Sequence, residues 1–495
     1  MLRVLGRAFQ GAERSRLEVL RRARQGAASI CETCDRHGLM TAALSTDLYQ
    51  LTMAAGYWRA GLTKPATFEL FVRRLPDHRS FLIAAGIDAA LEYLERLSFG
   101  DDDIAWLRDL PAFAHVPRAF FDEFLPRLTF SGDVWAVPEG TPMFANEPIL
   151  RVTAPQPEAQ VVETALLSML GFQTSIASKA ARIVAAAEGR AVIEFGARHA
   201  HGLEAALAAA RAAYLAGFDG TSLVEAARRF GIPASGTMAH SWVQTFDREM
   251  DAFNEFSRSF PDSAVYLLDT YDTLTAAAAL ARSGLNPRMV RLDSGDALAL
   301  SRQVRGILDA AGLTATRIFV TSDLDEYRIA ELLRAGAPVD GFGVGTAVTT
   351  VSDAPALPIV YKLVEVERGR ERAGVVKLSP GKDTWPGAKQ VWRVAAGGHY
   401  VRDVVAAADE PPVADAVGLL RPVMIAGRRV TAATAALADL RRECRAAIDK
   451  LPRELMQVDA AATYPVDFSE TLQARRRALE LATRRLDRRD VSAPE

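Results

Sequence analysis

The chain has 495 residues, of which 49% are hydrophobic and 24% are charged, and its formal net charge is -2. A chain of this length and composition can bury a large core, and we expect two or three domains. The near-zero net charge provides no global basic field for nucleic acid, and no run of about eighteen apolar residues predicts a membrane span. These numbers therefore disfavour nucleic acid and a membrane as partners.

Residues 1–39 differ in composition from the rest, because eight arginines fall among alanines and small polar residues. The segment lacks the apolar core of a secretion signal, and its four acidic residues weigh against a transit peptide. It contains Cys31 and Cys34, with His37 nearby, but no second cysteine pair follows, which disfavours a zinc site. We predict a basic extension that is not part of the fold.

The only other cysteine is Cys444, so the chain has no disulfide framework. This cysteine usage is consistent with a reducing cytosol, and we expect a cytoplasmic protein.

Residues 40–154 combine a helical opening with β-rich pieces at 66–73 and 132–137. Prolines and glycines between positions 138 and 155 mark loops that lead into the next segment. We predict a separate N-terminal α+β domain over residues 40–154.

Residues 155–358 alternate short apolar runs with helical patterns. The helices are expected at 202–213, 273–283, 297–311 and 325–335. Buried parallel strands are expected at 191–196, 233–237, 265–269, 289–295, 317–323 and 339–345. This alternation predicts an α/β barrel or a doubly wound sheet.

Polar side chains follow these expected strands. In a barrel, the carboxyl ends of all strands meet on one face, so these side chains should converge on one pocket. A lone histidine beside a strand is more often structural than catalytic. The convergence of several reactive groups nevertheless favours a binding or catalytic site. The groups expected at its mouth are His240, Asp269, Arg291, Asp293, Asp323 and Gly343.

The remainder of the chain is expected to begin with strands at 359–366, 374–378 and 390–395. Arginine-rich amphipathic helices are expected at 432–451 and 468–488, where the charges more plausibly cover the surface than bind a polyanion. We therefore divide it into a β-rich segment over 359–430 and C-terminal helices over 431–495.

Nine short motifs, in order, resemble those of the nicotinate phosphoribosyltransferases, and the resemblance extends over about residues 44–400. The motifs lie at Thr46–Met53, Phe68–Arg74, Glu139–Pro142, Glu194–Gly196, Gly236–Ser241, Leu268–Tyr271, Arg291–Asp296, Gly343–Thr346 and Tyr361–Val364. The resemblance implies an irregular α/β barrel of the type II phosphoribosyltransferase kind. It also implies an additional α+β, β-rich domain, formed when the 359–430 segment returns to the N-terminal domain.

Members of that family are ATP-dependent enzymes of the ligase class. They join nicotinate to 5-phosphoribosyl 1-pyrophosphate, which gives nicotinate mononucleotide, in the first step of NAD salvage. The resemblance further implies Mg²⁺ or Mn²⁺ as cofactor, a homodimer with shared active sites, and a transient phosphohistidine at His240. The imidazole of this histidine has a suitable nucleophilic nitrogen near neutral pH.

Nicotinate carries a flat ring and a carboxylate, so its pocket needs an aromatic face and a fixed cation. Arg291 can form a forked pair with the carboxylate, Tyr49 can stack on the ring, and Thr237 can supply a hydroxyl. Two simpler interpretations remain open. Arg291 could pair internally with Asp293 or Asp296, and Tyr49 could fill a domain interface.

The donor carries a 5′-phosphate and a pyrophosphate. Backbone amides around Gly343 and Gly345 and the Thr346 hydroxyl are suited to hold phosphate, although paired glycines are often only structural. Further candidates for the donor are Ser322, Asp323, Arg182, Arg198 and Ser241. Asp293 and Asp269 are candidates for the metal or the ribose hydroxyls, with helix capping or ion pairing as alternatives.

The chain departs from the family pattern at Ala197–Ala205, where His199 replaces the second of two adjacent arginines. This difference affects the expected phosphate contacts. Two other functions remain open from the sequence. One is a nicotinamide or quinolinate phosphoribosyltransferase, in which Glu194 could accept hydrogen bonds from an amide. The other is a non-catalytic, metabolite-binding relative of the barrel.

Overall fold

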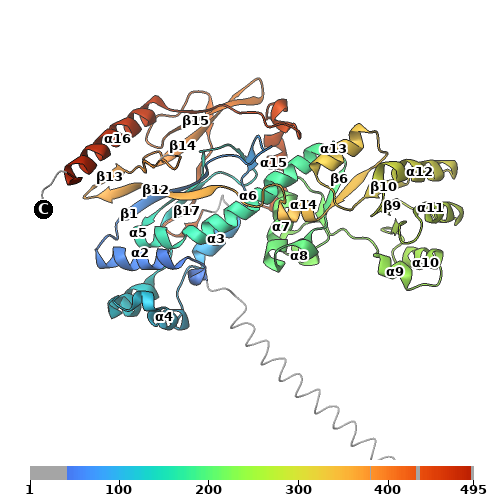
Figure 1. Cartoon of the computed structure of the whole chain (residues 1–495), viewed down its shortest axis with the longest axis horizontal. Helices are drawn as coiled ribbons and strands as arrows, with labels where there is room; N and C mark the ends of the chain where they lie inside the picture. Colours follow the sequence, from blue (N-terminus) through green and yellow to red (C-terminus); the bar gives the residue numbers. More distant parts are fainter. Residues whose placement is uncertain (1–41, 380, 431–434, 492–495) are drawn as a thin grey trace, which may run out of the picture.

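The computed structural model describes residues 42–379, 381–430 and 435–491. Figure 1 shows an elongated molecule, with antiparallel sheets towards one end and a parallel sheet towards the other. The long helix α6 (Glu163–Ala186) runs between them. The residues predicted at 1–39 as a basic extension, including Cys31 and Cys34, lie outside the described residues.

The parallel sheet has six strands in the order β7-β6-β11-β10-β9-β8. Its strands are β7 (Gly220–Thr221), β6 (Ala191–Glu194), β11 (Gly341–Val344), β10 (Arg317–Val320), β9 (Met289–Leu292) and β8 (Val265–Leu267). Within the described part of the chain, no pairing joins β7 to β8, so the sheet is an open, curled half-barrel. The expected α/β barrel is thus present in this half-closed form.

Helices connect these strands much as the sequence predicts. They are α7 (Leu203–Leu215), α8 (Val224–Phe230), α9 (His240–Gln244), α10 (Glu249–Ser259), α11 (Thr273–Arg282), α12 (Ala297–Ala310), α13 (Glu326–Arg334) and α14 (Thr346–Thr350). Three of them begin at an aspartate whose carboxylate accepts from the first-turn backbone N–H groups: Asp272, Asp296 and Asp325. Such caps satisfy donors that a helix start otherwise leaves unpaired.

Two predicted strands are wrong. The 233–237 segment makes only an isolated bridge between Ala234 and Thr221 of β7, because its small residues, proline and glycine favour an irregular extended loop. His240 therefore begins α9 rather than following a strand. In the second case, a strand was expected at 374–378, but β13 (Glu371–Gly374) ends at the first of these residues. The backbone N–H of Lys377 donates to the Thr384 side chain and not to a carbonyl of a neighbouring strand.

The largest antiparallel sheet combines segments far apart in the sequence, in the order β13-β12-β1-β5-β3-β17-β18. Its other strands are β12 (Ile359–Arg368), β1 (Pro65–Val72), β5 (Pro148–Pro155), β3 (Asp133–Ala136), β17 (Arg421–Ile425) and β18 (Arg428–Arg429). A second sheet contains β16 (Ala416–Gly418), β14 (Lys389–Ala396), β15 (His399–Ala407) and β19 (Val466–Phe468). Strands of the 359–430 segment therefore pair with β1 and β3, whereas the division into domains stays a prediction.

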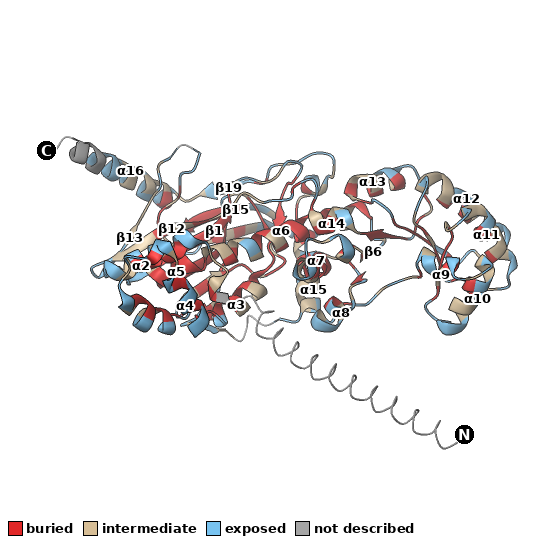
Figure 2. Ribbon diagram, turned by 60° about the horizontal axis from the view of Figure 1, so that its bottom comes forward, coloured by how far each residue is buried: buried red, intermediate tan, exposed pale blue. Residues whose placement is uncertain are grey.

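Two hydrophobic cores meet along α6. Its first half contributes Leu166 and Leu170 to the core beneath the seven-stranded sheet, and its second half contributes Ile176 and Ala180 to the core of the half-barrel. Figure 2 shows this helix largely buried among the surrounding elements. A helix that is buried on most sides must be apolar or must pair its polar groups, and α6 does both.

Further helices lie in the N- and C-terminal segments of the chain. Those at the N-terminal end are α2 (Leu48–Arg59), α3 (Ile87–Glu95), α4 (Asp101–Arg108) and α5 (Gln156–Val161). At the C-terminal end, α15 (Leu437–Ile448) buries the thiol of Cys444, and α16 (Glu470–Val491) pairs Arg475 with Asp409. None of the helices in the described ranges has the length and apolar character needed to cross a bilayer.

The close packing of the half-barrel predicts a cost for enlarging Gly341. A Cβ there would lie 2.8 Å from Cδ2 of Phe319 in the neighbouring strand. Gly341→Ala should therefore lower the free energy of unfolding by about 1–3 kcal/mol, measured by urea denaturation. Gly306→Ala is the matched control, because a Cβ in the middle of α12 meets nothing within 4 Å and should stabilise the helix by about 0.5–1 kcal/mol. Equal stability of the two variants would contradict the packing argument.

Candidate active site

The candidate site lies at the carboxyl edge of the half-barrel and is built around Arg291 on β9. Its guanidinium donates from Nη2 to Asp293 Oδ1 at 2.7 Å, from Nε to Thr321 Oγ1 at 3.0 Å, and from Nη1 to Thr237 Oγ1 at 2.7 Å. These partners come from the end of β9, the end of β10 and the loop before α9. One cation therefore ties three segments together.

Asp293 is held in its ionised form. Burial alone would raise the pKa of this carboxyl, but hydrogen bonds from Thr321 and Arg291 outweigh burial and lower the pKa. The Thr321 hydroxyl bonds to the same carboxylate oxygen that Arg291 contacts. The site thus contains a fixed negative charge next to its fixed positive charge.

His240 lies beside this pair. Its Nε2 is 3.6 Å from Asp293 Oδ2, and its Nδ1 is 3.2 Å from the hydroxyl oxygen of Thr270. The side chain keeps 40% of its surface exposed, so a phosphate donor can approach the ring. An accessible imidazole beside a fixed carboxylate is suited to carry a phosphoryl group, because the carboxylate stabilises positive charge on the ring.

The internal pair between Arg291 and Asp293, which the sequence left as an alternative, is present. It does not use all five N–H donors of the guanidinium. Nη2 keeps one N–H, and the other Nη1 donor makes only a 3.5 Å contact with the Met238 carbonyl oxygen. If the Nη1 contact with Met238 breaks, Arg291 has two N–H groups with which to bind the carboxylate of a substrate.

Asp269 follows β8 and accepts hydrogen bonds on Oδ2 from the Asp293 backbone N–H and the Ser294 hydroxyl. Its Oδ1 is buried and has no partner. A free carboxylate oxygen fits a divalent cation whose remaining ligands are substrate oxygens and water. Asp293 is already engaged by Arg291, and no cluster of three or more acidic, histidine or cysteine ligands occurs in the described ranges.

Glu249, near the start of α10, adds a further carboxyl to this region. Burial and the negative charges of Asp269 and Asp272 raise the pKa of Glu249 to about 7. Its Oε1 is buried without a hydrogen-bond partner. The sequence analysis missed this residue, since Glu249 lies on a helix and not at the end of a strand.

The candidate donor residues fall into two loops. Ser322 and Asp323 follow β10, are exposed, and have positive φ angles of 85° and 43°. Two adjacent non-glycine residues in this region are strained, which is common where a loop binds a ligand. In the second loop, Gly345 precedes α14 and the exposed Thr346 begins it.

Gly343 lies inside β11, where a Cβ would approach Thr321 Cγ2 to 2.6 Å and Phe195 Cδ2 to 2.7 Å. The close packing of Thr321 and Phe195 therefore requires glycine at this position. The structural interpretation of this glycine is sufficient, and its contact with phosphate stays a prediction.

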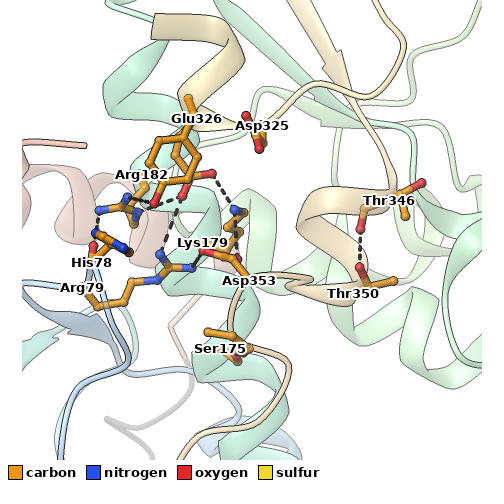
Figure 3. A network of polar contacts seen from close by, with 12 residues as sticks. His78, Arg79, Ser175, Lys179, Arg182, Asp325, Glu326, Thr346, Thr350 and Asp353 are labelled. Atoms are coloured by element: carbon orange, nitrogen blue, oxygen red, sulfur yellow. Dashed lines mark hydrogen bonds and ion pairs between the residues drawn. The ribbon is translucent and has the colours of Figure 1, made fainter. Parts of the chain in front are cut away.

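Arg182 and Arg198 occupy different environments. Arg182 is buried on α6, where Nε donates to Glu326 Oε1 at 2.9 Å (Figure 3). Its Nη2 donates to the Val458 carbonyl at 2.8 Å. Arg198 is exposed in the short helix Ala197–His199 and contacts the ring of His199, within the segment that departs from the family pattern. Arg182 belongs to an internal ion cluster, so it is less available to phosphate than Arg198.

Two remaining predicted residues also have clear positions. Ser241 is exposed on the first turn of α9, next to His240. Tyr49 is exposed on α2, which lies near the opposite end of the molecule from α9 and β9 in Figures 1 and 2. The structure thus groups His240, Thr237, Arg291 and the two aspartates, but it does not bring Tyr49 of the same chain to them.

Glu194 does not have a free carboxylate oxygen for a substrate amide. Its Oε2 accepts the Thr221 hydroxyl at 2.6 Å, and its Oε1 accepts the Gly196 backbone N–H. Its side chain instead holds the end of β6 in place. The hydrogen bonds to an amide that the nicotinamide alternative assigned to Glu194 therefore have no free carboxylate oxygen to accept them.

The sequence analysis also missed three groups that contact the site residues. Thr321 bonds to Arg291 and Asp293, Thr270 contacts His240, and the Phe195 ring centroid lies 5.9 Å from the Arg291 guanidinium carbon. Phe195 and Thr270 lie within two of the nine motifs, and Thr321 lies within the strand expected at 317–323. Their position near the ends of expected strands was the signal that could have identified them.

The fold and the site together define a protein of the α/β class, with a paired cation and carboxylate beside an accessible imidazole at the carboxyl edge of a parallel half-barrel. Sequence models of the nicotinate phosphoribosyltransferase N-terminal domain, the nicotinate phosphoribosyltransferase family and the nicotinate phosphoribosyltransferase C-terminal domain match residues 44–171, 191–379 and 413–476. The chain belongs to the nicotinate phosphoribosyltransferase family.

Similar proteins support this assignment. The chain is 46% identical to a nicotinate phosphoribosyltransferase of Mycobacterium tuberculosis, covering 87% of this chain and 92% of the relative. It is 44% identical to that of Bacillus subtilis, covering 74% of this chain and 76% of the relative. The crystal structure of human nicotinic acid phosphoribosyltransferase has a TM-score of 0.77 at 29% identity and covers 88% of this chain and 99% of its own.

The environment of Glu249 predicts a pH-dependent stability. A carboxyl whose pKa rises from 4.5 to about 7 on folding binds a proton more tightly in the folded state, so its contribution to stability is lost as the pH rises through this window. The glutamine of Glu249→Gln cannot ionise. The melting temperature of the variant minus that of the parent protein should therefore be larger at pH 8 than at pH 5. Thermal unfolding of both proteins at the two pH values measures this difference. A difference that is the same at both would show that Glu249 does not titrate there.

Proposed function

We propose that this nicotinate phosphoribosyltransferase joins nicotinate to 5-phosphoribosyl 1-pyrophosphate with coupled ATP hydrolysis, through a transient phosphate on His240. The observation that carries the proposal is the arrangement of His240, Asp293 and Arg291: an exposed imidazole 3.6 Å from a carboxylate that is paired with a cation at 2.7 Å. The nucleophile and the substrate-binding cation thus share one anchoring carboxylate.

Nicotinate would bind with its carboxylate on Arg291 and its ring near Phe195 and Thr237. The exposed aromatic side chain of Tyr49 would complete this pocket from a second copy of the chain, because α2 lies far from α9 and β9 within one chain. A homodimer with shared active sites follows from this proposal. Exposed Leu48 and Met53 beside Tyr49 on α2 supply apolar surface for such a contact.

In the first step, a neutral nitrogen of His240 attacks the γ-phosphorus of ATP, and the bond to the β-phosphate oxygen breaks as ADP leaves with the electron pair. Asp293 remains ionised and stabilises the positive charge that develops on the ring. Water later attacks the phosphohistidine, which releases inorganic phosphate and a proton and restores the neutral ring.

In the transfer step, the nicotinate ring nitrogen attacks the anomeric carbon of the donor, and the bond from this carbon to the pyrophosphate oxygen breaks. The exposed loops at Ser322–Asp323 and Gly345–Thr346, together with Arg198 and Ser241, are proposed to hold the phosphate groups. Asp269 would hold Mg²⁺ or Mn²⁺ through its free Oδ1, and such an ion, when bound, would neutralise negative charge on pyrophosphate.

We further propose that the antiparallel sheets of the N- and C-terminal segments form a β-rich domain of their own. The pairing of β1 with β12 and of β3 with β17 supports this division. A cytoplasmic location, in which ATP and the donor are available, is part of the same proposal.

Replacing Arg291 tests the nicotinate pocket. Arg291→Ala removes the fixed cation and leaves Asp293 unpaired, so nicotinate binding should weaken by about 2 to 5 kcal/mol, measured by isothermal titration. Donor binding should weaken less. Arg288→Ala is the control. Arg288 directly precedes β9, at the end of the strand away from the site, and its side chain donates to the Asp262 carbonyl. Equal nicotinate affinity of Arg291→Ala and the parent would remove Arg291 from the pocket.

Replacing His240 tests the ATP-coupled step. His240→Ala and His240→Asn should abolish ATP hydrolysis and the acid-labile phosphoenzyme, because no other group would carry the phosphate. The fold and some ATP-independent transfer at high donor concentration should persist. Incubation with γ-labelled ATP and peptide mapping measures the labelling, and His201→Ala, which alters another exposed histidine, should keep it. Label on a different residue would contradict the assignment.

A further inference from the structure

A buried ion cluster connects α6 with both proposed donor loops. At its centre, the Lys179 ammonium lies 2.6 Å from Glu326 Oε2 and 3.0 Å from Asp353 Oδ1. Figure 3 shows the two carboxylates meeting this lysine from different segments. The Lys179 side chain is 1% exposed, so it does not reach a ligand itself in this structure. Its contacts are therefore with the protein alone.

The two carboxylates belong to the segments that follow the donor loops. Glu326 begins α13, three residues after the strained Asp323. Asp353 follows α14, which begins at Thr346. The first residue after α14 is also unusual, because Val351 has a φ of 44°, which a β-branched residue rarely adopts. Strained backbone persists only where surrounding contacts hold it, and the Lys179 contacts lie next to both strained points.

Neighbouring cations complete the cluster. Arg79 donates to Asp353 Oδ2 at 2.7 Å and lies at 3.7 Å from Glu326 Oε1, and Arg182 donates to Glu326 Oε1 at 2.9 Å. On α6, Ser175 donates to the Ala354 carbonyl at 3.3 Å, one turn before Lys179 on the same helix face. Among these groups, Lys179 differs in having a short contact with each carboxylate. It is the single side chain of the described cluster that contacts both carboxylates at 3.0 Å or less.

We propose that Lys179 is a positioning residue for the phosphoribosyl donor: its ammonium sets the spacing between the Ser322–Asp323 loop and the Gly345–Thr346 loop. This inference rests on the proposed role of these loops in donor binding. Because nicotinate is assigned to Arg291 and Thr237, outside the cluster, loss of Lys179 should affect the donor more than nicotinate.

The test compares Lys179→Met with the parent enzyme in steady-state kinetics. The KM for 5-phosphoribosyl 1-pyrophosphate should rise by about tenfold, whereas the KM for nicotinate should change by less than about twofold. In the unliganded protein, amide hydrogen exchange should accelerate in both 321–325 and 345–354. Asp353→Asn weakens the same bridge without changing side-chain size, and it should shift the donor KM in the same direction.

Lys389→Met is the matched control. Lys389 is also a buried lysine and lies 2.7 Å from Glu69, but it belongs to the antiparallel sheets. It should lose stability without a selective change in the donor KM. Equal increases in both KM values for Lys179→Met, or an unchanged donor KM, would overturn the proposal.

Thr346→Ala separates a failure of this inference from a failure of the donor site. If Thr346→Ala raises the donor KM and Lys179→Met does not, the donor site stands and the role of Lys179 is wrong. If neither variant raises it, the donor site itself is misplaced and the role of Lys179 falls with it.

Discussion

The pairing of Arg291 with Asp293 is the interaction on which the candidate site depends. The two residues are separated by one position at the end of β9, so both side chains project to the same face of the sheet. This local geometry holds opposite charges 2.7 Å apart and keeps Asp293 ionised beside His240. An arginine alone would attract a substrate anion, whereas the pair would also provide a counter-charge for the phosphorylated imidazole that we propose. In the proposed mechanism, one strand end thereby connects substrate binding with the ATP-coupled step.

Helix α6 gives the second constraint, because it is shared by the two hydrophobic cores. Its apolar residues join the half-barrel to the antiparallel sheets, and its buried Lys179 and Arg182 must find partners in the protein. A buried charge without a partner would cost several kcal/mol, so these cations impose a fixed position on Glu326 and Asp353. Packing along α6 thus determines where the loops at the barrel edge lie.

The sequence predicted the parts of the fold that local patterns specify. The apolar runs at 265–269, 289–295 and 317–323 became β8, β9 and β10, because buried parallel strands are apolar on both faces. Helices α11, α12 and α13 were also predicted to within a few residues. The strand expected at 233–237 did not form, because its small residues, proline and glycine favour an irregular loop that makes only an isolated bridge with Thr221 of β7.

The site was predictable to the extent that strand ends converge. His240, Thr237, Arg291, Asp293 and Asp269 come together as expected, whereas Thr321 and Thr270 were missed because strand register decides which side chains meet. The contacts of Arg182 were equally hidden, since they depend on segments 104 to 276 residues away in the sequence. Long-range packing of this kind leaves no local pattern.

A mass-resolved product assay with and without ATP tests the central claim most directly. The enzyme would be given 5-phosphoribosyl 1-pyrophosphate with nicotinate, nicotinamide or quinolinate in separate reactions. The account predicts nicotinate mononucleotide from nicotinate alone, with more product and formation of ADP when ATP is present. Product from nicotinamide or quinolinate, or nicotinate mononucleotide formed equally well without ATP, would contradict it.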